Sequence, residues 1–324
     1  MPIKNYTSVS QLYIIRTSES SLFLDLSVFI ASVDFLLTTH TQDDILYLKI
    51  VKGVLITKKH HIFGGKVMKF GFRTGGFSEW KVEDVLKELA GIGFDGAELC
   101  LEPADMRPEN FSRDKANDLR KFVGKIGLEI ASVSYHADFE QLDQRITNTF
   151  KSIDITNWLG ADVLIINSER LDESKKEEQW NDLVIRLKQL TTHADNLGVN
   201  VAIEPEPLQI IGDTDDMILM MEAVDSPNLR VNLDVGHAYI TDPNLTESIK
   251  KLGSTIIHAH IEDIKDKIHN HLELGQGDIN FAEMHSAFME IGYEGYYVVD
   301  LFRLGDDPVG VASRTIQALR ERFS

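Results

Sequence analysis

The stretch LRVNLDVGH, residues 229–237, decides how the rest of the chain is interpreted. It begins with apolar residues spaced as in a short β-strand, and it ends in a carboxylate, Asp234, followed three residues later by an imidazole, His237. Gly236 lies between them, where a chain leaving a strand needs an unusual turn. A charged residue at the end of a buried strand is costly unless it is paired or holds a cation. The stretch therefore indicates a strand that ends in residues able to bind a cation or take part in a reaction.

Three further apolar segments also end in a polar residue: VAIEPEP at Glu204, IIHAHIED at His260 and YYVVDLF at Asp300. In a parallel β-barrel all strands end at one rim, so these residues and Asp234 would converge there. Any one of them alone is explained as well by pairing with an arginine or a helix N-terminus. Together, three carboxylates and one imidazole suit Mn²⁺, Mg²⁺ or Co²⁺, with Zn²⁺ as an alternative. The pattern predicts one divalent-metal centre, with Mn²⁺ as the preferred ion.

A repeated unit runs from Met68 to the end of the chain. In each unit a short apolar segment precedes a loop and an amphipathic helical pattern, and the units follow one another at intervals of about 27 to 40 residues. The apolar segments are 67–72, 96–101, 129–135, 162–167, 199–204, 229–234, 256–261 and 296–301. Several helical patterns end at a glycine: Gly93, Gly127, Gly160, Gly198 and Gly292.

Eight such units in residues 68–324 have the size and number of an α/β fold of the (β/α)₈ TIM-barrel type. A doubly wound open sheet is the rival fold, and it would need a glycine-rich phosphate loop after its first strand. The residues after the first predicted strand, Arg73-Thr74-Gly75-Gly76, match such a loop poorly. The sequence therefore predicts a TIM barrel over residues 68–324.

The composition limits the partners and the compartment. The chain has 324 residues, of which 43% are hydrophobic, enough for a barrel with an extension. Cys100 is the single cysteine, so no internal disulfide can form and a cytoplasmic location is expected. The net charge of −18 repels phosphate backbones and anionic membrane surfaces, so neither nucleic acid nor a membrane is an expected partner. The sequence leaves open whether the chain forms an oligomer.

Residues 1–67 form an N-terminal extension that differs from the rest of the chain. They hold seven basic and five acidic residues, which leaves residues 68–324 with 26 basic and 46 acidic residues and a net charge of −20. No clear period runs through them, although Ile45–Ile56 could form a strand. We interpret the extension as upstream sequence, with the native start at Met68. The alternative is a genuine extension without stable order.

Two segments near the predicted rim carry further candidates. His269 and His271 lie in the loop of residues 262–281, which we interpret as a flap that brings imidazoles and backbone N–H groups over a substrate. The alternative for this loop is an exposed polar segment. Arg303 follows the eighth predicted strand and could hold a substrate phosphate, or pair instead with Asp306 or Asp307.

Several segments resemble the xylose isomerase-like superfamily of barrels, which includes sugar isomerases, ketose 3-epimerases, inosose dehydratases and endonuclease IV. The segments are GFDGAEL (93–99), AIEPEP (202–207), NLDVGHAY (232–239), HAHIED (258–263), HNHLELGQGDINF (269–281) and GYEGYYVVDL (292–301). The resemblance covers nearly all of residues 68–324 and none of residues 1–67. As a set these motifs are specific for the superfamily and much less specific for one reaction.

The resemblance implies roles for individual residues. Glu204, Asp234, His260 and Asp300 match the superfamily's metal ligands. His237 matches a histidine that contacts or orients the substrate. Glu98 and His136 match positions that line the pocket for a small sugar or cyclitol.

One departure from the ketose 3-epimerase branch bears on the reaction. That branch usually has glutamate as its eighth-strand ligand, where this chain has Asp300, which is shorter by one methylene group. In that branch two glutamates bind the metal and exchange protons on opposite faces of an enediolate. Glu206 adds a carboxylate two residues beyond Glu204. We therefore consider Glu204, Asp300 and Glu206 as the catalytic candidates.

Four functions remain open at this point. The first is a metal-dependent isomerase or epimerase of a small sugar or sugar phosphate. The second is a lyase that dehydrates a cyclitol or keto-sugar. The third is an endonuclease IV-like phosphodiesterase, which the acidic charge of the barrel disfavours because DNA binding needs a basic face. The fourth is a barrel that keeps the fold and acts as a binding module.

Overall fold

The computed structural model describes residues 36–40, 44–51, 54–63, 66–77 and 80–323. The chain divides into two compact units, residues 1–68 together with Ser324, and Lys69–Phe323. The predictions for residues 1–35 lie outside the described residues. None of the helices in the described part of the chain is long and apolar enough to cross a lipid bilayer.

The described part of the first unit is an antiparallel sheet with the strand order β1-β2-β3-β4. Its strands are β1 (Leu36–His40), β2 (Asp44–Val51), β3 (Val54–Phe63) and β4 (Lys66–Val67). The prediction of one strand over Ile45–Ile56 is wrong, because β2 ends at Val51 and β3 runs back along it, with Val51 paired to Val54. Lys52 and Gly53 interrupt the apolar residues between Val51 and Val54, and such a two-residue break with a glycine is the sequence sign of a hairpin that the prediction overlooked.

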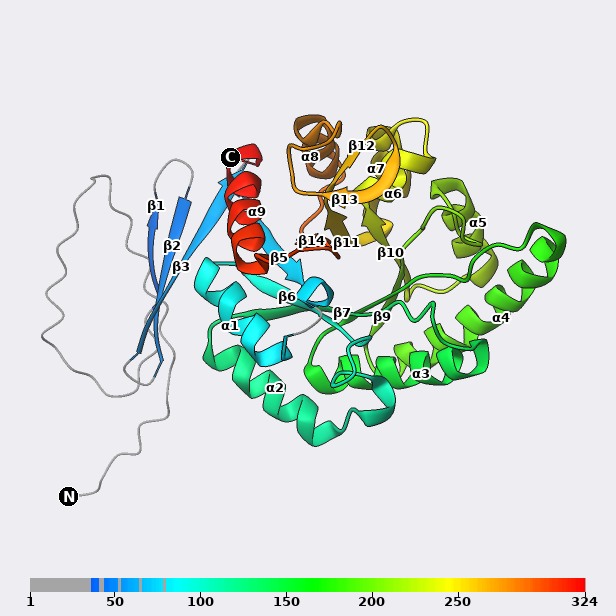
Figure 1. Ribbon diagram of the computed structural model, residues 1–324, viewed down its shortest axis with the longest axis horizontal. Helices are drawn as coiled ribbons and strands as arrows, with labels where there is room; N and C mark the ends of the chain where they lie inside the picture. The colour runs from blue at the N-terminus through cyan, green and yellow to red at the C-terminus, as the bar shows by residue number, and fades with distance from the viewer. Residues whose placement is uncertain (1–35, 41–43, 52–53, 64–65, 78–79, 324) are drawn as a thin grey trace, which may run out of the picture. The chain divides into compact units, whose positions relative to one another are not determined.

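The second unit confirms the predicted (β/α)₈ barrel. Eight parallel strands close in the order β10-β11-β14-β5-β6-β7-β8-β9, and helices cover them from outside (Figure 1). The strands are β5 (Lys69–Arg73), β6 (Gly96–Cys100), β7 (Glu129–Tyr135), β8 (Val163–Ile166), β9 (Asn200–Ile203), β10 (Leu229–Asp234), β11 (Ile256–Ile261) and β14 (Tyr296–Val299). A small hairpin of β12 (Asp263–Lys265) and β13 (Ile268–Leu272) follows β11.

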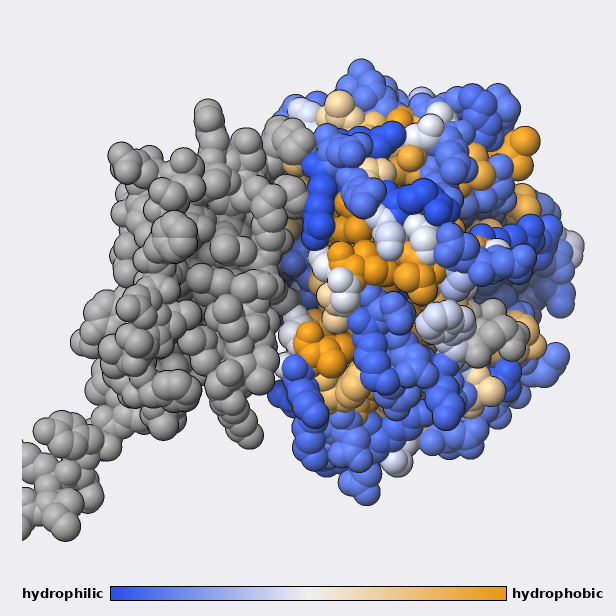
Figure 2. Space-filling model, turned by 60° about the vertical axis from the view of Figure 1, so that its left-hand side comes forward, coloured by the Kyte–Doolittle hydropathy of each residue, from blue (hydrophilic) through white to orange (hydrophobic). Residues whose placement is uncertain are grey.

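The helices alternate with these strands. They are α1 (Val82–Ile92), α2 (Arg113–Lys125), α3 (Leu142–Leu159), α4 (Lys176–Asp195), α5 (Thr214–Val224), α6 (Val235–Thr241), α7 (Leu245–Leu252), α8 (Phe281–Glu290) and α9 (Pro308–Arg322). Helices α1 and α3 end at Gly93 and Gly160, whose φ angles of 103° and 75° lie in the left-handed region that favours glycine. The predicted glycine stops are therefore confirmed at these two helices. The outer surface in Figure 2 is mostly hydrophilic, with smaller hydrophobic patches.

Alternation along the strands carries polar side chains into the barrel interior. Asn232 and Asp234 are two residues apart on β10, and the strand register pairs them with His258 and His260 on β11. All four side chains are buried. Asp234 and His260 therefore lie at the rim formed by the carboxyl ends of the strands, and Asn232 and His258 lie one layer below them.

Candidate metal centre and active site

The four residues that the sequence selects lie together at the rim. Asp234 ends β10, His260 lies near the end of β11, and Glu204 and Asp300 directly follow β9 and β14. One nitrogen or oxygen atom from each of the four lies within 4.8 Å of the corresponding atoms of the others. Their exposed fractions are 1%, 0%, 2% and 3% in the order named. The barrel thus gathers three carboxylates and an imidazole from four separate strands.

His260 is the centre of this cluster. Its Nδ1 atom lies 3.0 Å from Glu204 Oε2, 3.7 Å from Asp300 Oδ2 and 3.9 Å from Asp234 Oδ2. Burial alone would lower the pKa of His260, but the charges of Glu98 and Glu204 raise it well above its ordinary value. Burial alone would raise the pKa of Glu204, but the charge of His260, the largest opposing cause, lowers it to about 2. Carboxylates in this state are charged at neutral pH.

The donor set fits a divalent cation. Asp234 Oδ2 is buried and has no hydrogen-bond partner of normal geometry among the described residues, which is costly unless something else compensates it. Oxygen-rich sets with one imidazole bind hard or borderline divalent ions. A cation at His260 Nδ1 would displace its proton, so metal binding would be linked to proton release.

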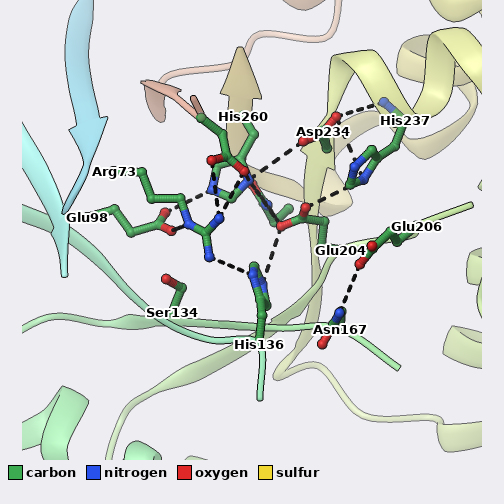
Figure 3. Close-up of polar contacts among 12 residues, drawn as sticks. Arg73, Glu98, Ser134, His136, Asn167, Glu204, Glu206, Asp234, His237 and His260 are labelled. Atoms are coloured by element: carbon green, nitrogen blue, oxygen red, sulfur yellow. Dashed lines mark hydrogen bonds and ion pairs between the residues drawn. The ribbon is translucent and has the colours of Figure 1, made fainter. Parts of the chain in front are cut away.

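Glu98 contacts His260 on the side of the imidazole ring that faces away from the carboxylate cluster. Its exposed fraction is 0%, and its carboxylate accepts hydrogen bonds from Ser132 Oγ at 2.9 Å and Arg73 Nε at 2.8 Å. His260 Nε2 lies 2.9 Å from Glu98 Oε2, which leaves Nδ1 directed at the carboxylate cluster (Figure 3). A carboxylate on the far nitrogen is the usual means of orienting a histidine ligand. Glu98, expected from the sequence to line the pocket, is therefore placed to orient His260.

Two residues of the site were missed by the sequence analysis. Arg73, at the end of β5, donates from Nη1 to both oxygens of Asp300, at 3.0 and 3.1 Å. Glu262 follows β11, and its carboxylate accepts the backbone N–H of Gly236 at 2.6 Å. Burial and the charge of Asp234 raise the pKa of Glu262 well above its ordinary value. Both residues lie at strand ends, so the same positional rule that selected Asp234 could have selected them.

Three further histidines lie over one side of the cluster. His237 Nε2 lies 2.9 Å from His269 Nε2, which lies 3.0 Å from His271 Nε2. His237 Nδ1 lies 3.1 Å from the carbonyl oxygen of Pro205, and His271 Nδ1 lies 2.9 Å from that of Asp300. The structure therefore brings both histidines of the loop to the rim, as the sequence analysis expected of a flap.

Glu206 and His136 both lie beside Glu204 (Figure 3), and His136 Nε2 is 3.5 Å from Glu204 Oε2. Glu206 Oε2 accepts a hydrogen bond from Asn167 Nδ2 at 2.8 Å (Figure 3) and another from Gln209 Nε2 at 2.6 Å. Burial raises the pKa of Glu206, and the charge of His237 opposes that shift. Glu206 also lines a cavity of about 310 Å³. Its raised pKa and partial exposure distinguish it from the buried cluster.

Arg303, the candidate for holding a substrate phosphate, follows β14 in the chain. Its side chain is exposed, and its guanidinium group lies over the ring of Phe302 at 5.5 Å from the centroid. Asp307, one of the alternative partners, is paired instead with Arg314. No contact recorded among the described residues connects Arg303 with the cluster.

Asp263 holds the loop that carries His269 and His271. Its buried carboxylate accepts four backbone N–H groups at 2.8 to 3.2 Å, those of Ile264, Gly275, Gly277 and Ile279. The loop approaches so closely that a Cβ atom on Gly277 would lie 2.3 Å from Asp263 Oδ1. This close approach explains the need for glycine at residue 277.

Replacing Asp263 by alanine should therefore destabilise this loop. Because buried donors would lose their acceptor, we expect Asp263→Ala to lower the free energy of unfolding by about 3 kcal/mol, measured by urea denaturation. Asp278→Ala is the matched control, since Asp278 is exposed on the same loop and accepts one backbone N–H, from Asp266. Equal losses in the two variants would contradict the anchoring role.

Comparisons with known proteins identify a family and relatives to which this chain is similar. A family model described as xylose isomerase-like TIM barrel matches residues 86–322. Fructoselysine 3-epimerase of Shigella flexneri is 24% identical over 72% of this chain and 90% of its own length. Inosose dehydratase of Bacillus thuringiensis is 24% identical over 67% of this chain and 81% of its own length. The crystal structure of D-allulose 3-epimerase from Methylomonas sp. has the same fold, with a TM-score of 0.66, 19% identity and coverage of 79% and 98%.

Proposed function

The chain belongs to the xylose isomerase-like TIM-barrel family, and from that premise we propose that it is a divalent-metal-dependent isomerase or epimerase of a small sugar or sugar phosphate. The observation that carries the proposal is the convergence of Glu204, Asp234, His260 and Asp300 within 4.8 Å. The named relatives, which include a sugar epimerase and a cyclitol dehydratase, support a polyhydroxylated substrate.

In this proposal the four clustered residues hold the cation, with Mn²⁺ as the preferred ion and Mg²⁺, Co²⁺ or Zn²⁺ as alternatives. A divalent cation in such a site polarises a carbonyl and its neighbouring hydroxyl and so acidifies the C–H bond between them. His260 is held for this task by Glu98, and Asp234 is held by its hydrogen bond from the backbone N–H of His237 at 2.7 Å. The chain therefore supplies an oriented set of ligands.

Glu206 is our choice for the base that removes the carbon-bound proton. A raised pKa makes a carboxylate a stronger base, and burial shifts Glu206 in that direction. Asn167 and Gln209 donate to its Oε2 atom, and no hydrogen bond to Oε1 is recorded among the described residues. Glu204, one of the four clustered residues, is the second candidate for proton transfer. Return of the proton to the opposite face gives an epimer, and return to the neighbouring carbon gives an isomer.

The second candidate function is a lyase acting on a cyclitol or keto-sugar. It is favoured by the engagement of Asp300, because both of its carboxylate oxygens accept hydrogen bonds from Arg73. A proton exchange on two faces needs a free carboxylate on each side of the substrate. With Asp300 occupied, one-sided proton removal followed by loss of a β-hydroxyl group is the alternative outcome.

Incubation with ketoses and inososes in deuterated water tests the proposal and separates its two forms. The protein should first be loaded with Mn²⁺ and its metal content measured. An isomerase or epimerase is expected to introduce deuterium at carbon and to form a product of unchanged composition. A lyase is expected to release water and form an unsaturated or keto product. Absence of both reactions across the panel would count against an enzyme of this class.

A further inference from the structure

Arg73 contacts three partners that surround the proposed metal centre. Its Nε donates to Glu98 Oε1 at 2.8 Å, its Nη1 donates to Asp300, and its Nη2 lies 2.7 Å from Nδ1 of His136 (Figure 3). The guanidinium group is planar, and two carboxylates from different strands hold it in place. Its third contact, to His136, therefore has a defined direction.

The contact with Arg73 determines the tautomer of His136. A guanidinium group has only donors and stays protonated, so Nδ1 of His136 must accept the hydrogen bond with its lone pair. The proton of the neutral ring then lies on Nε2. The backbone N–H of His136 donates to the Glu102 carboxylate, which anchors the residue from its main chain.

The Nε2 atom of His136 points into the site without a protein acceptor. It is buried and has no hydrogen-bond partner among the described residues, and the nearest carboxylate oxygen, Glu204 Oε2, is 3.5 Å away. A buried donor without an acceptor is costly, and such groups commonly serve a ligand. The donor lies beside Glu204, where a substrate oxygen next to the metal centre would be.

The other histidines of the rim do not offer an equivalent donor. His237 and His271 direct Nδ1 at backbone carbonyl oxygens, and the Nε2 atoms of both face His269 Nε2. His260 directs Nε2 at Glu98. Among the described histidines of the rim, His136 alone presents an N–H group with no protein acceptor.

We infer that His136 donates a hydrogen bond from Nε2 to the substrate oxygen on which negative charge develops, and that Arg73 is the positioning residue that holds the required tautomer. The proton stays on Nε2 throughout, so the group acts as an electrophilic donor and not as an acid. A donor aimed at developing charge stabilises the transition state more than the ground state. The catalytic part of this inference rests on the proposed function, whereas the tautomer does not.

Nitrogen-15 NMR of histidine side chains tests the tautomer without any substrate. The protein would be loaded with diamagnetic Mg²⁺, and the His136 signals would be assigned by their loss in His136→Gln. We expect a protonated Nε2 and an unprotonated Nδ1 in the wild type, and loss of this single tautomer in Arg73→Lys. Lysine keeps the positive charge beside Glu98 and Asp300, but its flexible ammonium group cannot hold three directions at once. A proton on Nδ1, or an unchanged tautomer in Arg73→Lys, would overturn the inference.

Steady-state kinetics tests the catalytic role once a substrate turns over. We expect His136→Leu to lower kcat about 100-fold with a much smaller change in KM, as for loss of one oxyanion donor. His136→Gln retains an N–H donor, so its kcat should be about tenfold higher than that of His136→Leu. Arg73→Lys should lower kcat without loss of bound metal, and Arg113→Met, at an exposed arginine of α2, should leave it unchanged. Arg73→Lys, His136→Gln and Arg113→Met thus separate positioning, donation and an unrelated change of charge.

Equal activity of His136→Leu and the wild type would overturn the catalytic role. If no substrate in the panel reacts with the wild-type protein, the proposed function is contradicted, whereas the NMR result on the tautomer still stands.

Discussion

Replacing Glu204 by glutamine is expected to lower kcat by about 1,000-fold while the barrel stays folded. The variant removes one negative charge from the proposed metal centre and changes no other heavy-atom position. Glu204 Oε2 lies 3.0 Å from His260 Nδ1 and accepts a hydrogen bond from Asn232 Nδ2 at 2.8 Å. A glutamine amide can preserve one of these contacts and cannot act as a charged ligand.

Two measurements accompany this variant. Metal content should fall in the purified protein, and the thermal midpoint of the metal-free protein should stay within about 5 °C of the wild type. The matched control is Glu129→Gln, at the start of β7 and so at the opposite end of the barrel, which should keep both metal and activity. Full turnover in Glu204→Gln would show that Glu204 is neither a ligand nor a base.

Asp234→Asn is expected to weaken metal binding by about 100-fold or more, the loss typical of disturbing a metal site. Asp234 has two roles that this substitution separates. Oδ1 accepts the backbone N–H of His237 at 2.7 Å and so caps α6, whereas Oδ2 faces the cluster. Asparagine can cap a helix as well as aspartate can. The helix should therefore survive while the charge of the cluster is reduced.

The control for the capping role is Asp213→Asn, because Asp213 caps α5 by accepting the N–H of Asp216 at 2.9 Å. Both variants should show similar thermal midpoints in the absence of metal. Isothermal titration with Mn²⁺ should detect the loss of affinity only in Asp234→Asn. Equal affinities in the two variants would exclude Asp234 as a ligand.

The convergence of four distant residues could be predicted from the sequence because the topology provides it. Once eight strand-helix units are recognised, every strand must end at the same rim, so Glu204, Asp234, His260 and Asp300 come together without any knowledge of side-chain packing. The strand β10 has the bounds predicted for it, Leu229–Asp234. Period and polarity were therefore enough for the barrel and for the composition of its centre.

The contacts within the centre could not be predicted in this way. Arg73 ends β5, and the sequence analysis considered it only as part of a poorly matching phosphate loop, not as a site residue. Its pairing with Asp300 joins residues 227 positions apart in the sequence, and only strand order places β5 beside β14. The resemblance to the superfamily implied that Glu98 lines the pocket. Its depth below the rim, which brings it to His260, depends on the stagger of the strands and could not be predicted from the sequence. Arg303 was selected because it follows the eighth predicted strand. A loop has no repeating pattern of side-chain directions, so the sequence does not predict where an exposed loop side chain points.

Arg73 contacts both the proposed hydrogen-bond donor, His136, and the carboxylate that bears on the reaction type, Asp300. The same guanidinium group that orients His136 also binds both oxygens of Asp300. An arginine partner was the alternative explanation for each candidate ligand, and Asp300 has such a partner while it also lies within the four-residue cluster. Arg73→Lys should therefore affect the balance between epimerisation and dehydration as well as the rate.

Crystals grown with Mn²⁺ and measured for anomalous scattering test the central claim most directly. The expected result is one strong peak. It should lie at about 2.0 to 2.3 Å from one carboxylate oxygen of each of Glu204, Asp234 and Asp300, and at a similar distance from Nδ1 of His260. Nδ1 is expected because Nε2 faces Glu98. No peak among these four side chains, or a peak bound elsewhere in the barrel, would contradict the account.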